Sequence, residues 1–377
     1  MNNYKKLDVF FEKRKVGTLA RTTDYLVAFE YDNEWINRGF SLNPFSLPLR
    51  KEVFIPKGYD PFDGLFGVFS DSLPDGWGRL LLDRLLLSHS VNPESVDSLN
   101  RLAIVGSSGM GALSYVPEIE FEIDISNKTI DELATECGKV YDSKKSEDLD
   151  VLFRLGGSSG GARPKIFYEF DGEEWIVKFP SLFDPKNIGE QEYDYAECAK
   201  RCGIIFPKTR LIPSKNCSGY FAVKRFDREN GRRIYMASVS ALLETSHRLP
   251  NLDYNILMQL TMRLTNSYKE IEKMFRIMCF NVFAHNRDDH SKNFSFIYNN
   301  EDNKWCVSPA YDLTYSHSIG GEHATTVNGN GRNPDMKDVL AVAENIKMNL
   351  SKAKIIANEI KEIVYTDLED KYLRNHL

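Results

Sequence analysis

The sequence predicts an α+β protein with a β-rich N-terminal domain, followed by a two-lobed core whose C-terminal lobe is mainly helical. Near the N-terminus apolar residues alternate with polar ones, which is the period of a half-buried strand. Short strand-like runs recur between residues 165 and 226, and from residue 237 onward apolar residues recur at helical spacing. Strand-rich segments followed by helical ones are typical of the α+β class.

The N-terminal domain, expected over residues 1–118, begins as a small antiparallel sheet. After the turn-forming Leu73-Pro74-Asp75-Gly76, residues 77–87 have helical spacing and good helix formers, and Pro74 and Asp75 suit the start of a helix. The sheet is predicted from two alternating apolar sets separated by polar and turn-forming residues: Leu7, Val9 and Phe11, then Tyr25, Val27, Phe29 and Tyr31.

Residues 119–149 are expected to form a polar connecting segment, because the stretch 142–148 has too little apolar content to hold a core. The next lobe, 150–240, is expected to combine a sheet with one helix around 190–202. The last lobe, 241–377, is expected to be helical. The predicted strands are 165–170, 175–179 and 220–226, and the predicted C-terminal helices are 254–262, 268–284, 336–345 and 352–364.

Composition excludes several classes of protein. The 377 residues are 42% hydrophobic and 27% charged, as in ordinary globular proteins, so disorder is excluded. The net charge of −6 argues against attraction of the whole protein to nucleic acid. The six cysteines form no CxxC pair, and no run approaches the roughly 18 apolar residues of a membrane span. We therefore expect a cytoplasmic protein.

The stretch Arg287 to Asn293 carries the strongest chemical signal. Phosphoryl transfer needs a carboxylate that accepts a proton from the attacking hydroxyl, and oxygen ligands that hold magnesium against the phosphates. Asp288 and Asn293 have the spacing Asp-x-x-x-x-Asn, in which base and metal ligand share one loop. Asp289 is the competing base but fits the spacing less well. Taken singly, either carboxylate could belong to a solvated turn.

Asp312 is the candidate for a second metal-binding carboxylate. It follows a strand-like stretch at 293–298, a turn at 299–303 and another short strand, which together predict a hairpin. Such a hairpin would return the chain to the loop that carries Asp288. The alternative for Asp312 alone is a helix N-cap.

A glycine-rich stretch, Gly156 to Lys165, lies just before a predicted strand. Small residues there allow backbone N–H groups to approach phosphate oxygens, although a flexible linker is an equal alternative. Lys178 is a lone charge in an apolar strand, where it could face phosphates or, on an edge strand, reach solvent. Glu192 could orient Lys178, with Glu190 and Glu197 as rivals.

These residues, in this order, resemble the HipA family of toxin Ser/Thr protein kinases from bacterial toxin–antitoxin systems. The resemblance runs over nearly the whole chain. It is carried by Ser70 to Gly78, Gly109 to Leu113, Ser158 to Lys165, Val177 to Pro180, Val223 to Arg228, Asn286 to Phe294 and Tyr311-Asp312.

The resemblance implies a kinase-like core that uses ATP and Mg²⁺, with Asp288 as catalytic base and Asn293 and Asp312 as metal ligands. It also implies autophosphorylation of Ser158, or of the adjacent Ser159, which in the family ejects the phosphate loop and turns the kinase off. His290 would position the catalytic loop. The implied ATP-binding residues are Ser158, Ser159, Gly160, Gly161, Ala162, Lys165, Lys178, Lys224, Arg225, Phe226 and His290.

The resemblance also implies partners. These are a helix-turn-helix antitoxin, operator DNA reached through the antitoxin complex, and a protein substrate that is typically an aminoacyl-tRNA synthetase of the glutamyl type. Two alternatives stay open from the sequence: a kinase-derived co-repressor that binds an antitoxin and operator DNA, and a small-molecule kinase.

Overall fold

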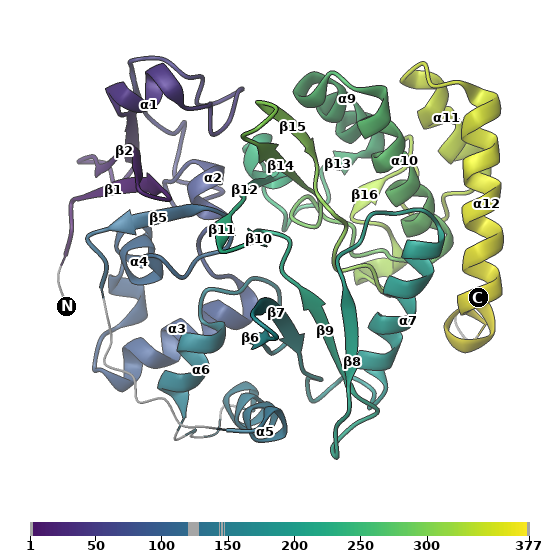
Figure 1. Ribbon diagram of the computed structural model, residues 1–377, viewed down its shortest axis with the longest axis horizontal. Helices are drawn as coiled ribbons and strands as arrows, with labels where there is room; N and C mark the ends of the chain where they lie inside the picture. The colour runs from purple at the N-terminus through teal and green to yellow at the C-terminus, as the bar shows by residue number, and fades with distance from the viewer. Residues whose placement is uncertain (1–2, 120–127, 143, 145, 147, 375–377) are drawn as a thin grey trace. The chain divides into compact units, whose positions relative to one another are not determined.

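The computed structural model describes residues 3–119, 128–142, 144, 146 and 148–374 (Figure 1). The chain forms two compact units. Unit 1 comprises residues 1–189, 211–237 and 241–244, and unit 2 comprises residues 190–210, 238–240 and 245–377.

Unit 1 begins with a five-stranded antiparallel sheet in the order β4-β3-β2-β1-β5. The predicted alternation is realised in β1, where Leu7, Val9 and Phe11 are buried. Tyr25 lies outside the strands and is exposed. The strands are β1 (Lys6–Phe11), β2 (Arg14–Arg21), β3 (Val27–Tyr31), β4 (Val53–Phe54) and β5 (Leu113–Val116).

Four helices of unit 1 accompany this sheet. The helix predicted after the turn at residues 73–76 is α3, and it buries Leu81, Leu82, Leu85 and Leu86 completely. The four helices are α1 (Asn33–Arg38), α2 (Gly67–Ser70), α3 (Gly76–Ser88) and α4 (Ser98–Val105).

The second sheet has the order β6-β7-β9-β8, and Ile166 and Val177 from one of its faces are buried in a core with Trp77. Within unit 1 a further hairpin pairs Arg228 with Arg233. The elements of this part of the chain are β6 (Lys165–Phe170), β7 (Glu173–Lys178), β8 (Thr209–Ile212), β9 (Tyr220–Lys224), β10 (Arg228–Glu229), β11 (Arg232–Arg233), β12 (Tyr235–Ser238) and α8 (Val239–Leu242). Residues 209–210 of β8 and residues 238–240 of β12 and α8 belong to unit 2.

The stretch around 119–149 carries more structure than its polar composition suggests. Helix α5 (Ile130–Tyr141) starts in a capping box between Thr129 and Glu132, and α6 (Leu149–Gly156) follows it. Leu133, Cys137 and Val140 lie on one face of α5 and are buried in the core beside β6 and β7. Three apolar residues at helical spacing are enough to bury one face of an otherwise polar helix.

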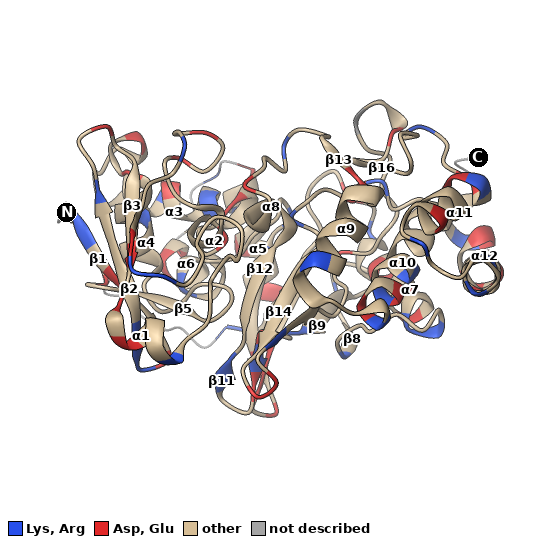
Figure 2. Cartoon of the chain, turned by 90° about the horizontal axis from the view of Figure 1, so that it is seen from above, with Lys and Arg blue, Asp and Glu red and all other residues tan. Residues whose placement is uncertain are grey.

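Unit 2 is mainly helical, as predicted, and α10 packs against both α9 and α12. Helix α12 carries three lysines and three acidic residues, and Figure 2 shows both charge colours on it, so this helix carries no field of a single sign. No described helix is both long and apolar enough to cross a membrane. The helices are α7 (Ile188–Arg201), α9 (Tyr254–Thr265), α10 (Tyr268–Phe283), α11 (Met336–Asn345) and α12 (Leu350–Leu368).

The predicted hairpin before Asp312 forms in unit 2. Strands β14 (Ser295–Asn299) and β15 (Lys304–Val307) pair antiparallel, with Phe296 opposite Val307. A second pair, β13 (Leu252–Asp253) and β16 (Thr325–Thr326), is parallel. Both pairs border the loop that carries Asp288. Thr325 of β16 donates a hydrogen bond to Asp289, and Tyr311, which follows β15, donates one to Lys292.

Candidate active site

The loop Arg287 to Asn293 in unit 2 is anchored by a buried carboxylate. Asp289 is fully buried, and its side chain accepts hydrogen bonds from the Tyr254 hydroxyl at 2.8 Å and from the Thr325 amide at 3.1 Å. His323 Nδ1 lies 2.9 Å from the same carboxylate. Burial, with the negative charge of Asp289 next to it, raises the pKa of Tyr254 far above its ordinary value, so the phenol stays protonated and donates.

The anchor continues into helix α10. Asn281 Nδ2 donates to the Tyr254 hydroxyl at 2.9 Å, and Asn286 Nδ2 donates to Asn281 Oδ1 at 2.9 Å. This chain of side chains joins α9, α10 and the start of the loop. A buried polar network with most of its members satisfied gives the loop one defined conformation.

Asp288 is exposed, unlike its buried neighbour Asp289, and 63% of its side chain is accessible to solvent. The Asn293 amide nitrogen donates to the Asp288 carbonyl at 2.6 Å, and the Asn293 backbone amide donates to the His290 carbonyl at 2.8 Å. His290 Nδ1 accepts from the Lys292 amide at 3.2 Å. The hydrogen of a neutral His290 ring is then on Nε2, which lies 3.9 Å from Asp288 Oδ1.

Asp312 follows a residue that is tied to the same loop. The Tyr311 hydroxyl donates to the Lys292 carbonyl at 2.8 Å, so the residues before Asp312 and before Asn293 are directly bonded. Asp312 has a positive φ of 52°, a conformation that Asp tolerates better than most residues and that is enriched at functional sites.

Asn293 and Asp312 together suit a hard cation. The nitrogen of the Asn293 amide is used within the loop, which leaves its oxygen as the atom available to a cation. The Tyr311–Lys292 hydrogen bond joins the residues that precede Asp312 and Asn293. Mg²⁺ is commonly held by one or two protein oxygens plus phosphate and water. Within the part of the chain that the structure describes, no three His, Cys, Asp or Glu side chains gather into a metal site by themselves.

The glycine-rich loop Gly156 to Lys165 lies in unit 1 and is held by the start of α3. The Trp77 amide donates to the Gly161 carbonyl at 2.8 Å, and the Trp77 indole donates to the Lys165 carbonyl at 2.9 Å. The Gly161 amide donates to the Asp75 carboxylate. At Gly78 a Cβ would lie 2.2 Å from the Ser159 carbonyl oxygen, so only glycine fits this close approach.

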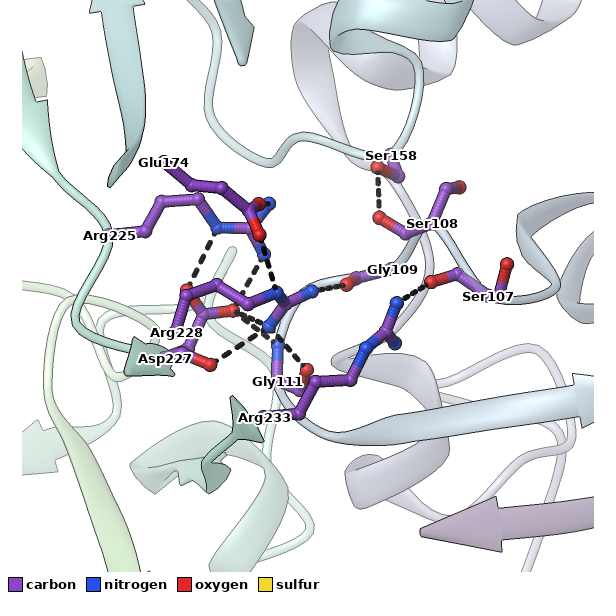
Figure 3. Close-up of polar contacts among 10 residues, drawn as sticks. All are labelled: Ser107, Ser108, Gly109, Gly111, Ser158, Glu174, Arg225, Asp227, Arg228 and Arg233. Atoms are coloured by element: carbon purple, nitrogen blue, oxygen red, sulfur yellow. Dashed lines mark hydrogen bonds and ion pairs between the residues drawn. The ribbon is translucent and has the colours of Figure 1, made fainter. Parts of the chain in front are cut away.

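The two loop serines have different partners. Ser159 is 1% exposed, and its hydroxyl donates to the Gly156 carbonyl at 2.5 Å within the loop. Ser158 is 7% exposed, and its hydroxyl donates to the Ser108 carbonyl at 2.8 Å (Figure 3). A phosphate acceptor must be accessible, so either serine has to leave this position before it can react.

Two lysines lie on one face of the second sheet next to this loop. Lys165 and Lys178 are directly opposite each other in the pairing of β6 with β7, so their side chains share a face. Lys165 Nζ donates to the Gly160 carbonyl at 2.5 Å, which brings its charge to the loop, where Ala162 also lies. Like charges directly opposite in a sheet repel, and an anion between them would relieve the repulsion.

The side chains of Lys224 and Arg225 are engaged elsewhere. Lys224 Nζ lies 2.6 Å from the Glu173 carboxylate, and the guanidinium of the buried Arg225 pairs with Asp227. Phe226, the next residue, is half-buried.

Three residues that contact or support the phosphate loop were missed by reasoning from the sequence: Asp75, Ser108 and Asp227. Asp75 and Asp227 lie in motifs that carried the family resemblance, but the sequence predicted no role for either aspartate itself. The signal available for Asp75 was its position between Pro74 and Gly76. This position indicates the start of a helix but not a contact with the phosphate loop.

The fold and these two loops define a class: an α+β protein with a glycine-rich, lysine-flanked loop in one unit and an Asp-x-x-x-x-Asn loop in the other. The family model "HipA-like C-terminal domain" matches residues 157–367, and the model "HipA N-terminal domain" matches residues 7–116. The chain belongs to the HipA family, which confirms the resemblance seen in its motifs.

The known proteins that are similar to this chain include a curated relative and a solved structure. The protein "Putative kinase Y4dM" of Sinorhizobium fredii (strain NBRC 101917 / NGR234) is 26% identical over 174 residues, and the match spans 42% of each protein. A chain in the solved complex of the Shewanella oneidensis MR-1 toxin–antitoxin system HipA, HipB and its operator DNA superposes with a TM-score of 0.71. That match has 17% identity and covers 97% of this chain and 90% of that chain, and it confirms the predicted α+β fold.

Proposed function

We propose that this protein is an ATP-dependent Ser/Thr protein kinase and the toxin of a toxin–antitoxin pair. The observation that carries the proposal is that two adjacent carboxylates have different environments. Asp289 is buried and anchors the loop, while Asp288 is exposed and its backbone carbonyl accepts from the Asn293 side chain. A solvated turn would need no such anchor.

In this proposal Asp288 orients the attacking hydroxyl and accepts its proton. His290 holds the loop through its bond from the Lys292 amide. Asn293 and Asp312 would hold Mg²⁺, which when bound neutralises charge on the transferring phosphate. Lys165, Lys178 and the backbone of Gly160, Gly161 and Ala162 would hold the phosphates of ATP. The backbone of Lys224 to Phe226 would hold adenine.

Ser158 is the proposed site of autophosphorylation. Its hydroxyl bonds to a separate segment of the chain, whereas that of Ser159 closes a bond within the loop itself. Ser158 therefore becomes free when the loop moves as a whole, while Ser159 needs the loop to lose its own internal contact. This difference supports Ser158 over Ser159.

The proposed partners are a helix-turn-helix antitoxin, operator DNA bound through that antitoxin, and an aminoacyl-tRNA synthetase of the glutamyl type as substrate. Membership of the HipA family supports the antitoxin, and the similar Shewanella chain was solved with HipB and its operator DNA. The synthetase rests on the family resemblance alone.

Phosphate transfer from labelled ATP with Mg²⁺ tests the activity, both to the protein itself and to purified synthetases. We expect Asp288→Asn and Asp312→Asn to lower transfer by at least about a thousandfold, because each removes a group that acts on the reacting phosphate. Asp302→Asn is the matched control, because Asp302 is an exposed carboxylate in the β14–β15 turn. Absence of transfer by the unaltered protein, or equal rates in all variants, would refute the proposal.

A further inference from the structure

The segment Ser107 to Gly111, between α4 and β5, is held by charged side chains from residues 227–233. The Gly111 amide donates to the Asp227 carboxylate at 2.8 Å. Arg228 donates to the Gly111 carbonyl at 2.7 Å and to the Gly109 carbonyl at 3.0 Å, and Arg233 donates to the Ser107 carbonyl (Figure 3). The segment therefore has its backbone bonded at both ends and in the middle.

The charged cluster that holds this segment is centred on a buried ion pair of Asp227 with Arg225. Asp227 is 1% exposed and accepts from Arg225 at 2.9 and 2.8 Å and from Arg228 at 2.8 Å. Arg225 also donates to Glu174 at 3.2 Å, and its guanidinium lies over the Phe167 ring at 4.4 Å. Burial alone would raise the pKa of Asp227, but the two arginines overcome it and lower the pKa to about 2.

The middle of the segment contacts the phosphate loop. The Ser108 carbonyl accepts from the Ser158 hydroxyl at 2.8 Å, while the Ser108 amide and hydroxyl both donate to the Val105 carbonyl at 2.8 Å. The two bonds to Val105 hold Ser108 in place, so its carbonyl is a well-positioned acceptor for Ser158. Figure 3 shows the Ser158 hydroxyl directed at this segment, and the charged side chains of Asp227 and Arg228 beside Gly109 and Gly111.

We propose that Asp227 and Arg228 are positioning residues for the phosphate loop, acting through the 107–111 segment and its Ser108–Ser158 hydrogen bond. The inference deepens the proposed function, on which its consequence for ATP rests. The start of α3 holds the loop at Gly161 and Lys165, and the clamped segment holds it at Ser158. The N-terminal domain thus sets the conformation of the loop from two sides.

Hydrogen–deuterium exchange of the ligand-free protein tests the link without requiring kinase activity. In Asp227→Asn and in Ser158→Ala we expect the amides of residues 158–160 to exchange about tenfold faster, which corresponds to about 1.4 kcal/mol. The exchange rates of the amides of residues 161–165 should change less, because the start of α3 holds that end of the loop. Asp83→Asn is the matched control, since Asp83 also pairs with two arginines in unit 1, Arg79 and Arg101, and both of these lie outside the 107–111 segment.

The double variant Asp227→Asn with Ser158→Ala tells whether Asp227 acts on the loop through Ser158 or independently of it. If Asp227 acts through Ser158, the double variant exchanges no faster than the faster of the two single variants. Multiplied rates, or an unchanged loop in Asp227→Asn, would overturn the inference. Should Asp227→Asn fail to fold, Arg228→Lys takes its place, because it keeps the charge but loses the two-pronged contact with Gly109 and Gly111.

ATP affinity of the same variants, measured by calorimetry with Mg²⁺ and a non-hydrolysable analogue, completes the test. We expect Asp227→Asn and Ser158→Ala to weaken binding by about tenfold each and the double variant no further, with Asp83→Asn unchanged. If the unaltered protein binds no ATP, the proposed function fails, while the exchange rates still decide whether Asp227 positions the loop.

Discussion

The catalytic loop of unit 2 and the phosphate loop of unit 1 are held in opposite ways. Asp289, a side chain of the catalytic loop itself, is buried and bonded to Tyr254, His323 and Thr325. The phosphate loop is bonded mainly through its backbone to side chains and backbone from elsewhere in unit 1, such as Asp75 and Trp77. The first loop is therefore anchored through one of its own side chains, whereas the second is held mainly through its backbone by segments that can be altered separately.

The largest expected effect is on stability, at the anchor of the catalytic loop. Asp289→Ala should lower the free energy of unfolding by about 3 kcal/mol or more, because it leaves Tyr254, His323 and the Thr325 amide buried without their acceptor. Chemical denaturation measures this. Asp288→Ala, one residue away and exposed, should change stability by less than about 0.5 kcal/mol. Similar losses in both would remove the distinction between the two carboxylates.

The phosphate loop should respond to crowding from α3. Gly78→Ala places a Cβ 2.2 Å from the Ser159 carbonyl, so the loop or the helix must shift, at a cost of about 1–3 kcal/mol in thermal unfolding. Gly138→Ala is the matched control, because a Cβ at this site in α5 meets nothing within 4 Å. There alanine should stabilise by about 0.5–1 kcal/mol. Equal effects would mean that the α3 contact does not constrain the loop.

The two regions should also differ in their response to pH. Burial, followed by the charge of Arg287, lowers the pKa of His285 from 6.5 to about 4. As pH falls from 6.5 to 4 the unfolded chain takes up this proton first, so the free energy of unfolding decreases over that range. His285→Asn should flatten this slope, since Asn tolerates the positive φ of 53° found there.

The cluster that holds the 107–111 segment behaves differently. With its pKa lowered from 3.8 to about 2, Asp227 contributes stability that is present above pH 4 and lost as the pH falls toward 2. Denaturation of Asp227→Asn between pH 4.5 and 7 should therefore show a constant loss relative to the unaltered protein. A loss that varies strongly over this range would contradict the lowered pKa.

The smallest expected effect is at Asp75. Asp75→Asn keeps an acceptor for the Gly161 amide but removes a negative charge from the loop. A unit charge about 6 Å from an anion in water is worth about 0.7 kcal/mol, so the ATP analogue should bind about threefold more tightly. Calorimetry measures this. Weaker binding would show that the charge of Asp75 organises the loop rather than opposing its ligand.

Much of the fold follows from local patterns. The alternation at Leu7, Val9 and Phe11 predicts β1, and the helical spacing after Pro74 predicts α3 nearly to the residue. The segment before α6 is the instructive difference. Its polar residues dominate the composition, but Leu133, Cys137 and Val140 lie on one face and need only one buried side. Composition counts the residues on all faces of a helix together, whereas packing depends on the one face that is turned toward the core.

The candidate site was predictable only in part, for a similar reason. The spacing of Asp288 and Asn293 is a local pattern, and so is the glycine content of residues 156–161, because each depends on residues close together in the chain. The bonds from Ser158 to Ser108 and from Gly161 to Asp75 join residues 50 and 86 positions apart. No short-range periodicity encodes such pairs.

The sequence by itself determined the α+β class, the family, and which polar residues are candidates for chemistry. Only the tertiary structure decided which of two adjacent aspartates is buried, which loop serine bonds outside its own loop, and that Asp227 holds a segment next to that serine. The physical reason is that burial and hydrogen-bond partners are set by residues distant in the chain, while spacing and composition report only on near neighbours.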